Sequence, residues 1–243
     1  MRKVRVQTTY NNTKEEKMNL QNIVPWGRNL SEYVAMFSLS SDDLNSKILG
    51  CGDGPSSFNI EMDLNGGSVV SVDPLYAYSR VEIAQRIDEV SHEVMEQVVA
   101  NKDDFIWKDI TNTGMLYEMR IEAMSEFLMD YNEGKEEGRY IAEELPSLSF
   151  ADDSFELALS SHFLFLYSQH LDEAFHMDSI LEMLRVAREV RIFPLVTLEG
   201  EKSAYVESII QQLQKLGYSA EIVTTNYEFQ KGANEMMKIT RGK

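Results

Sequence analysis

The sequence predicts an α/β fold with a doubly wound, mostly parallel sheet of seven strands and a helical insertion between the second and third strands. Short apolar runs alternate with segments of helical periodicity, which is typical of a parallel sheet with helices on both faces. A glycine-rich turn follows the first apolar run, and such sheets bind ligands beyond the carboxyl ends of their strands. Since no internal repeat is found, we expect residues 1–243 to form a single domain.

The first 40 residues are expected to precede the sheet. Residues 1–19 are polar and predict a loosely ordered arm, whereas residues 20–40 hold Trp26 and Phe37 and predict a helix that packs on the domain. The next segment, from residue 47 to 72, has the pattern strand, turn, helix, strand. Pro55 fits the first position of that helix, where the missing N–H of proline needs no partner.

Residues 79–138 are expected to form a helical insertion that acts as a lid. Apolar side chains recur every three or four residues over 83–98 and again over 115–131, so each stretch has one apolar face. The run Asn132-Glu133-Gly134 predicts the end of the second helix. Because a parallel crossover needs only one helix, these residues exceed the minimal fold.

The alternation of strands and helices resumes after the insertion. Strands are expected over 139–142, 155–160, 190–193, 220–224 and 235–240, and helices over 171–187 and 203–216. Pro194 would stop the third of these strands, and Gly217 would cap the last helix. This pattern completes the seven expected strands.

Composition narrows the class of protein. The net charge of −17 disfavours a nucleic-acid partner, because binding to phosphates depends on Lys and Arg side chains. The single cysteine, Cys51, excludes an intrachain disulfide and fits a reducing compartment. No run of about 18 apolar residues is present, so we expect no membrane span and a cytoplasmic location.

Three glycines at alternate positions, in Gly50-Cys51-Gly52-Asp53-Gly54, form the glycine-rich turn. Glycine permits positive φ and lets a ligand approach where a Cβ would block it. A dinucleotide fingerprint would need glycine where Pro55 stands, and a phosphate-binding P-loop would need a lysine that is absent. Asp73 ends the second apolar run, where a carboxylate can accept hydrogen bonds from a ribose. The turn and this carboxylate predict a nucleoside site.

A second segment extends the pattern to a family resemblance. Residues 145–158 contain a Leu-Pro turn and then Asp-Asp-Ser-Phe-Glu before an apolar strand, which Ser160-Ser161-His162 ends. With the G-x-G-x-G turn and the closing pair of strands, this segment resembles class I S-adenosylmethionine-dependent methyltransferases, whose fold is Rossmann-like. The resemblance covers about residues 45–77 and 139–240. The sequence departs from the family at Ile48, where an acidic residue is usual, and in the insertion.

The resemblance implies S-adenosylmethionine as cofactor and assigns roles to side chains around it. The glycine backbone would pass beneath the methionyl and ribose parts, and Asp73 would accept hydrogen bonds from the ribose hydroxyls. Pro74 and Leu75 would border the adenine. Glu143 or Glu144 would reach the adenine amino group.

Further cofactor contacts are implied on both sides of the turn. Arg28 could bind the carboxylate of the cofactor bidentately, and Tyr33 could add a hydroxyl. Asp53 would either contact the cofactor or cap the following helix, while Cys51 packs inside the turn. The expected cofactor-binding set is Gly50, Cys51, Gly52, Asp53, Gly54, Asp73, Pro74, Leu75, Glu143, Arg28 and Tyr33.

His162 is the candidate catalytic residue, because an imidazole with a pKa near neutrality can accept a proton from an O–H or N–H nucleophile. A structural role is the alternative. The spacing of His162, His170 and His176 matches no metal site, so no metal is expected. The expected function is methyl transfer to a small-molecule O, N or C acceptor. The alternative is a non-catalytic S-adenosylmethionine- or nucleoside-binding protein of the same fold, and Pro55 disfavours a nicotinamide dehydrogenase.

Overall fold

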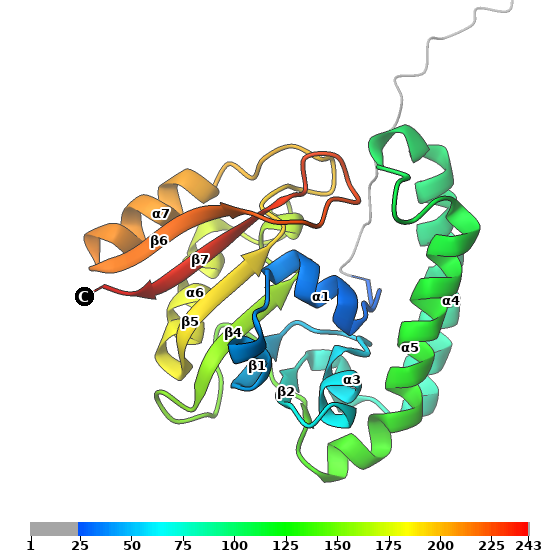
Figure 1. Cartoon of the computed structure of the whole chain (residues 1–243), viewed down its shortest axis with the longest axis horizontal. Helices are drawn as coiled ribbons and strands as arrows, with labels where there is room; N and C mark the ends of the chain where they lie inside the picture. The colour runs from blue at the N-terminus through cyan, green and yellow to red at the C-terminus, as the bar shows by residue number, and fades with distance from the viewer. Residues whose placement is uncertain (1–23, 243) are drawn as a thin grey trace, which may run out of the picture.

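The computed structural model describes residues 24–242, so the expected arm over residues 1–19 lies outside the described residues. Its strands are β1 (Lys47–Cys51), β2 (Ser68–Val72), β3 (Tyr140–Ile141), β4 (Phe155–Ser161), β5 (Ala187–Phe193), β6 (Tyr218–Thr224) and β7 (Glu235–Arg241). They form one sheet in the order β3-β2-β1-β4-β5-β7-β6 (Figure 1). β7 is antiparallel to β5 and β6, and the other neighbours are parallel. The expected mostly parallel, seven-stranded sheet is confirmed.

Helices cover both faces of the sheet. They are α1 (Leu30–Phe37), α2 (Ser41–Leu44), α3 (Phe58–Leu64), α4 (Arg80–Ala100), α5 (Thr113–Glu136), α6 (Glu173–Val186) and α7 (Val206–Lys215), with 3-10 turns η1 (Pro74–Ala77), η2 (Lys102–Asp104) and η3 (Phe165–Tyr167). Adjacent residues of a strand point to opposite faces. Leu49 therefore packs with Ile180 of α6 in one core cluster, and Ile48 packs with Phe58 of α3 in another. The doubly wound arrangement follows from this alternation.

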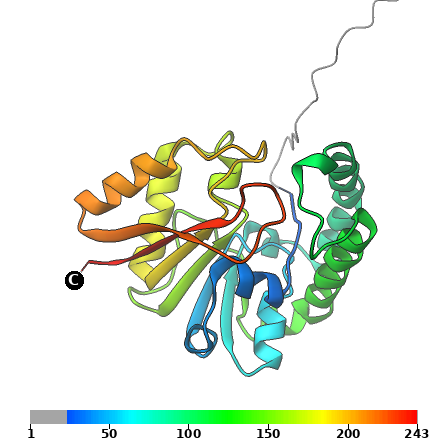
Figure 2. The same cartoon turned by 45° about the horizontal axis from the view of Figure 1, so that its top comes forward.

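The segment between β2 and β3 is a pair of long helices, α4 and α5. Figures 1 and 2 show the pair beside the β3 edge of the sheet, at the opposite end from α7. The predicted apolar face of α4 is confirmed, because Ile83, Ile87, Val90, Val94 and Val98 are all buried. Side chains of both helices enclose the rings of η1 and β3 in one apolar cluster. This cluster holds the pair against the sheet.

The expected end of the second long helix at residues 132–134 is wrong. α5 continues to Glu136, and the chain turns at Gly138, where φ is 77°. Gly134 has a packing role instead, since a Cβ there would lie 2.5 Å from the Tyr140 ring. The glycine therefore permits close approach of helix and strand rather than ending the helix.

Pro55 does not begin a helix, contrary to the expectation. α3 begins at Phe58, after the N-cap residue Ser57. The preceding loop is held by Ser56 Oγ and the Ser57 N–H, which donate to the carbonyl of Arg28 at 2.5 and 3.1 Å. These bonds fix the loop against the chain that precedes α1, so the helix starts three residues later than expected.

The expected helix over residues 20–40 is shorter than predicted within the described chain. α1 begins at Leu30, because the Asn29 side chain accepts from the Glu32 N–H and the Glu32 carboxylate accepts from the Asn29 N–H. The segment before α1 crosses the loop that follows the glycine turn. A Cβ at Gly27 would lie only 2.0 Å from the carbonyl oxygen of Pro55. This close crossing brings residues 24–28 beside the segments that follow the carboxyl ends of the strands.

Candidate functional site

A cavity of about 980 Å³ lies at the carboxyl ends of the parallel strands. At one end it is lined by the glycine turn after β1, by residues 72–75 after β2 and by residues 143–146 after β3. Residues 161–163 after β4 line it beside the glycine turn, since a Cβ at Gly52 would lie 3.0 Å from the Phe163 ring. Ligand cavities in proteins are typically about 300–1,000 Å³, so this one has room for a nucleoside and a second small molecule.

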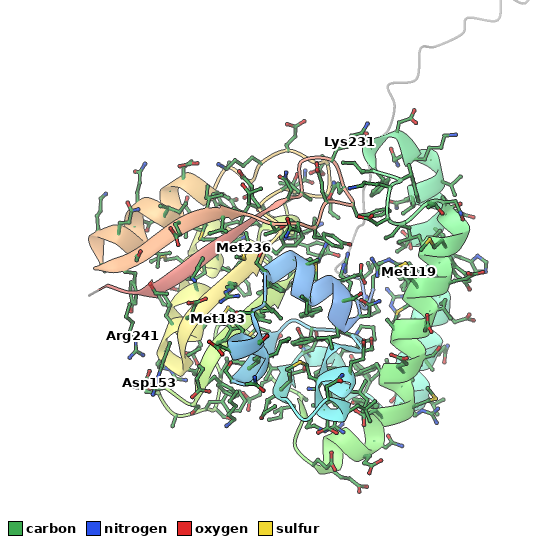
Figure 3. The ribbon with its side chains drawn as sticks, viewed as in Figure 1. Met119, Asp153, Met183, Lys231, Met236 and Arg241 are labelled. Carbon is green, nitrogen blue, oxygen red and sulfur yellow. The ribbon has the colours of Figure 1, made fainter. Side chains whose placement is uncertain are left out.

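Part of the cavity is an apolar lobe. Its walls come from α4, α5, η3 and the β6–β7 loop, and its apolar lining residues are Val94, Val98, Phe105, Leu116, Leu166, Tyr167, Leu171, Leu198 and Phe229. The loop is tied to the α4–α5 linker, because the Ile106 N–H donates to the Phe229 carbonyl at 2.7 Å. The Lys231 N–H donates to the Asp104 carbonyl at 2.9 Å, and Figure 3 labels Lys231 close to this linker. The loop and the helix pair together roof the lobe.

The glycines of the turn permit both positive φ angles and close packing. Gly52 and Gly54 have φ of 69° and 54°, which favours glycine. A Cβ at Gly50 would lie 1.7 Å from Asp53 Oδ2, so the carboxylate folds back over the end of β1. Gly50 and Cys51 belong to β1 and do not line the cavity. Gly52 and Gly54 do line it, and a Cβ at Gly54 would meet no atom within 4 Å, whereas one at Gly52 would meet the Phe163 ring at 3.0 Å.

Asp53 is held beneath the turn by two hydroxyls. Tyr33 Oη donates to Oδ1 at 2.8 Å, and Ser71 Oγ donates to Oδ2 at 2.6 Å. Burial raises the pKa of Asp53 to about 6, although these two hydrogen bonds act in the opposite direction. Asp53 does not cap the following helix, whose N-cap is Ser57. The Tyr33 hydroxyl, expected near the cofactor, is already committed to Asp53, and both residues border the cavity.

Asp73 lies at the cavity wall with both carboxylate oxygens engaged. Oδ2 accepts from the Gly54 N–H at 2.9 Å, and Oδ1 accepts from the Leu75 N–H at 2.8 Å, which caps η1. Burial raises the pKa of Asp73, and the two N–H groups partly offset this effect. Each oxygen keeps a free lone pair, since an ionised carboxylate has about four acceptor sites. Pro74 and Leu75 also line the cavity beside it.

A buried network of arginine, glutamate and tyrosine forms another part of the wall. Arg120 of α5 donates to both oxygens of Glu32 of α1, at 2.5 and 2.6 Å, and Tyr227 Oη donates to Glu32 at 2.9 Å. Arg28 has one side-chain hydrogen bond in the described chain, to the Trp26 carbonyl at 3.0 Å, and its buried Nε has no partner there. Burial, and then the charge of Arg120, lower the pKa of Arg28. Arg28 is thus a cation without a carboxylate partner among residues 24–242.

Sequence reasoning identified Arg28 but missed Glu32, Arg120 and Tyr227. A signal existed for Arg120, which falls on the apolar face of its helix between Leu116 and Ala123. A charged side chain at a core position is almost always paired or functional. Glu32 and Tyr227 carry no comparable signal, because each is one polar residue in a short helix or a loop.

His162 lies at the end of β4 and borders the cavity. Its φ is 52°, in the left-handed region, and its Nδ1 is 3.0 Å from Ser161 Oγ. Burial first, and then the charges of Arg28 and Arg120, lower the pKa of His162 well below 6.5. The expectation of a pKa near neutrality is therefore wrong, and the imidazole is neutral at physiological pH.

Glu143 and Glu144 both reach the cavity, on its β3 side. Glu143 is half-buried and accepts from the N–H and Oγ of Ser149 at 2.9 and 2.5 Å, whereas Glu144 is exposed. Within residues 24–242 no group of three His, Cys, Asp or Glu side chains is arranged to hold a metal ion. Over the same described range, no helix is both long and apolar enough to cross a bilayer.

The strand order and the direction of β7 identify the fold. A β3-β2-β1-β4-β5-β7-β6 sheet with antiparallel β7 is the Rossmann-like fold of class I methyltransferases. No family model matches the sequence. The chain is 36% identical over 226 residues to the uncharacterized protein MJ0045 of Methanocaldococcus jannaschii, across 92% of this chain and 99% of that protein. The chain belongs to the same family as this archaeal protein.

Solved structures with a similar chain path are more distant. A magnesium protoporphyrin IX methyltransferase from Synechocystis with bound SAM has 13% identity and a TM-score of 0.45, over 88% of this chain and 78% of that one. A SAM-dependent methyltransferase from Methanosarcina mazei has 13% identity and a TM-score of 0.45, over 82% and 93%. A putative RNA methyltransferase from Pyrococcus horikoshii has 11% identity and a TM-score of 0.43, over 87% and 82%.

Proposed function

We propose that this protein binds S-adenosylmethionine in the cavity and transfers its methyl group to a small-molecule O, N or C acceptor. The observation that carries the proposal is the hydrogen bond between Asp73 and the Gly54 N–H, which joins carboxylate and turn into one surface for a ribose. Arg28 fits the other end of the cofactor, because it lacks a carboxylate partner in the described chain. Bound there, S-adenosylmethionine would supply a methyl group already activated on its sulfonium.

The residues around the cavity would bind and orient the ligands. Asp73 would accept from the ribose hydroxyls with its remaining lone pairs, and Glu143 would meet the adenine amino group beside Pro74 and Leu75. Arg28 would donate to the methionyl carboxylate.

In the part of the cavity where the methyl group would be transferred, the neutral His162 would accept or donate one hydrogen bond. The roof of α4, α5 and the β6–β7 loop would exclude water and hold the acceptor close to the methyl group. We include in this proposal a lid role for residues 79–138, a single domain and a cytoplasmic location.

Calorimetry with S-adenosylmethionine, S-adenosylhomocysteine and NAD tests the cofactor. We expect both sulfur nucleosides to bind and NAD to bind far more weakly, because Pro55 replaces the third glycine of a dinucleotide site. Asp73→Ala should weaken nucleoside binding by about tenfold or more, since it removes charge-assisted hydrogen bonds. Asp153→Ala is the matched control, because Asp153 pairs with Arg241 on the surface away from the cavity (Figure 3). If neither S-adenosylmethionine nor S-adenosylhomocysteine binds at millimolar concentration, the proposal is wrong.

The second candidate function is a non-catalytic nucleoside-binding protein. The observation that favours it is the depressed pKa of His162, because a weaker base is less able to take a proton from an O–H or N–H acceptor. A screen of small molecules with methyl-labelled S-adenosylmethionine separates the two, since only an enzyme transfers the label. The net charge of −17 favours small molecules over nucleic acids in that screen.

A further inference from the structure

The charged side chains of the cavity wall come from other segments than those of the apolar lobe. The carboxylates on the wall are those of Asp53, Asp73, Glu82, Glu89, Glu143 and Glu144, and the guanidiniums are those of Arg28, Arg86 and Arg120. The carboxylates come from the glycine turn, the end of β2, the first half of α4 and the segment after β3. Among the cavity-lining residues in the ranges 94–116, 163–171 and 229–233, none is charged. The lobe itself therefore offers no charged partner to a ligand.

The charges nearest to the lobe are already neutralised. Arg120 lies one turn beyond Leu116 on α5, but Glu32 accepts from both of its terminal nitrogens at 2.5 and 2.6 Å. In the proposed function the carboxylate of the cofactor neutralises Arg28. An ionised group that entered the lobe would lose its water without gaining a partner, which is costly. The electrostatics of the lobe therefore favour an uncharged ligand.

The lobe adjoins the part of the cavity where the methionyl half of the cofactor would lie. The Val24 N–H donates to Tyr167 Oη at 3.3 Å, and Arg28 follows four residues later along the chain, a span of at most about 14 Å. On the other side, η3 begins three residues after His162, which ends β4. The expected adenine contacts follow β2 and β3 instead. A ligand in the lobe would therefore face the methyl-bearing end of the cofactor.

Tyr167 gives the lobe one polar atom that lacks an acceptor. The residue is 3% exposed and lines the cavity. Its oxygen accepts from the Val24 N–H, and among residues 24–242 no group accepts the hydroxyl proton in return. Burial raises the pKa of Tyr167, so the hydroxyl keeps its proton at neutral pH. Because a buried donor without an acceptor is costly, this hydroxyl favours a ligand that carries an acceptor atom.

Aromatic rings form the wall of the lobe beneath the roof. Phe105 of the α4–α5 linker and Phe229 of the β6–β7 loop stack with ring centroids 4.9 Å apart, and both line the cavity. A ring in the ligand can pack against these rings offset or edge-on, which contributes beyond the apolar area that it buries. The walls therefore favour an apolar molecule that contains a ring.

We propose that the methyl acceptor is an uncharged, apolar, ring-containing molecule that binds in the apolar lobe and accepts a hydrogen bond from the Tyr167 hydroxyl. The proposal rests on the proposed function and names its acceptor class. Phe229 and Tyr167 determine the specificity, the first through the ring of the acceptor and the second through its oxygen or nitrogen atom. Organic anions and protonated amines of the same shape are rejected, because the lobe has no charged group to receive them.

Three probes with the same ring test the charge of the ligand by calorimetry: 2-naphthylmethanol, the anion 2-naphthoate and the cation 2-naphthylmethylammonium. Each is titrated into the protein with and without saturating S-adenosylhomocysteine. We expect the alcohol to bind about tenfold or more tightly than either ion, because only the ions must leave water without a partner. Equal or tighter binding of either ion, or no measurable binding of the alcohol, would overturn the proposal.

Two variants test the residues that determine specificity. Phe229→Ala should weaken binding of 2-naphthylmethanol about fivefold or more, because it removes an aromatic contact. Its matched control is Tyr117→Ala, which removes a ring of α5 that is 44% exposed and does not line the cavity. Tyr167→Phe should weaken binding of the alcohol about fivefold and leave that of 2-methylnaphthalene, which has no hydroxyl, unchanged. Equal changes for these two probes, or a Phe229→Ala effect no larger than that of Tyr117→Ala, would contradict the assignment.

Titration with S-adenosylhomocysteine alone separates this proposal from the proposed function. If S-adenosylhomocysteine binds and 2-naphthylmethanol does not, the acceptor class is wrong and the cofactor site stands. If neither S-adenosylmethionine nor S-adenosylhomocysteine binds, the proposed function fails. The naphthyl series still decides in that case whether the lobe prefers an uncharged ring.

Discussion

Glu32→Gln should strongly destabilise the protein, because one buried carboxylate connects three parts of the cavity wall. Glu32 is 4% exposed and accepts from Arg120 of α5, from Tyr227 of the β6–β7 loop and from the Asn29 N–H at the start of α1. Glutamine keeps the size of the side chain but loses its charge. It also presents an NH₂ group to a donor of Arg120. The variant would leave two buried cations with no anion bound to either within the described chain.

The expected loss can be worked from this geometry. Removing one partner of a buried ion pair costs about 3–5 kcal/mol, because the other charge stays buried. For a chain of this length each kcal/mol lowers Tm by about 2–4 °C, so we expect Tm to fall by about 6–20 °C. Urea denaturation measures the free energy of unfolding directly. The control is Glu207→Gln, which removes an exposed 2.8 Å pair with Lys202. It should cost at most about 1 kcal/mol.

The pH dependence gives a second, independent check on Glu32. Burial alone would raise the pKa of Glu32, but the charge and hydrogen bonds of Arg120 outweigh burial and lower it from 4.5. A carboxyl group with a lowered pKa in the folded state stabilises the fold above its unfolded pKa and loses that effect as the pH falls through the folded value. The gap between wild type and Glu32→Gln should therefore be full at neutral pH and shrink below about pH 4. A loss no greater than that of Glu207→Gln, or a gap unchanged in acid, would refute this reasoning.

Three smaller perturbations test other parts of the site. Burial raises the pKa of Asp53 to about 6, so ionisation of this carboxyl group destabilises the folded protein as the pH rises from about 4 to about 6. The urea midpoint of the wild type should fall over that range, and the midpoint of Asp53→Asn should fall less. Parallel plots of midpoint against pH for the two proteins would contradict this prediction. Gly52→Ala and Gly66→Ala should each cost about 1–2 kcal/mol for positive φ, but Gly52→Ala should cost more and also weaken nucleoside binding in calorimetry, because its Cβ would meet the Phe163 ring at 3.0 Å. Tyr227→Phe removes one donor to the buried carboxylate and should lower the free energy of unfolding by about 1.5–3 kcal/mol in urea denaturation; no change would mean that water replaces the hydroxyl.

The sequence by itself determined the sheet and the place of the glycine turn and Asp73. Apolar residues that recur every second residue mark strands, and those that recur every three or four residues mark helices, because local backbone geometry sets the direction of each side chain. The same reasoning located the glycine turn and Asp73, whose hydrogen bond to the Gly54 N–H joins the ends of adjacent strands. The errors at Pro55 and at residues 132–134 have a common cause. In each case a contact with another element, with Arg28 before α1 or with Tyr140 of β3, outweighed the local preference.

Only the tertiary structure decided the electrostatics of the cavity. Glu32 is separated from Arg120 by 88 residues and from Tyr227 by 195, so no local pattern couples them. The state of His162 likewise depends on its cover, because burial and the two arginines, rather than its neighbours in sequence, lower its pKa. Desolvation and charge act through space, and their size depends on everything packed around a group. The sequence could therefore place the glycine turn and Asp73 at one edge of the sheet, whereas the folded chain decided which charges line the cavity.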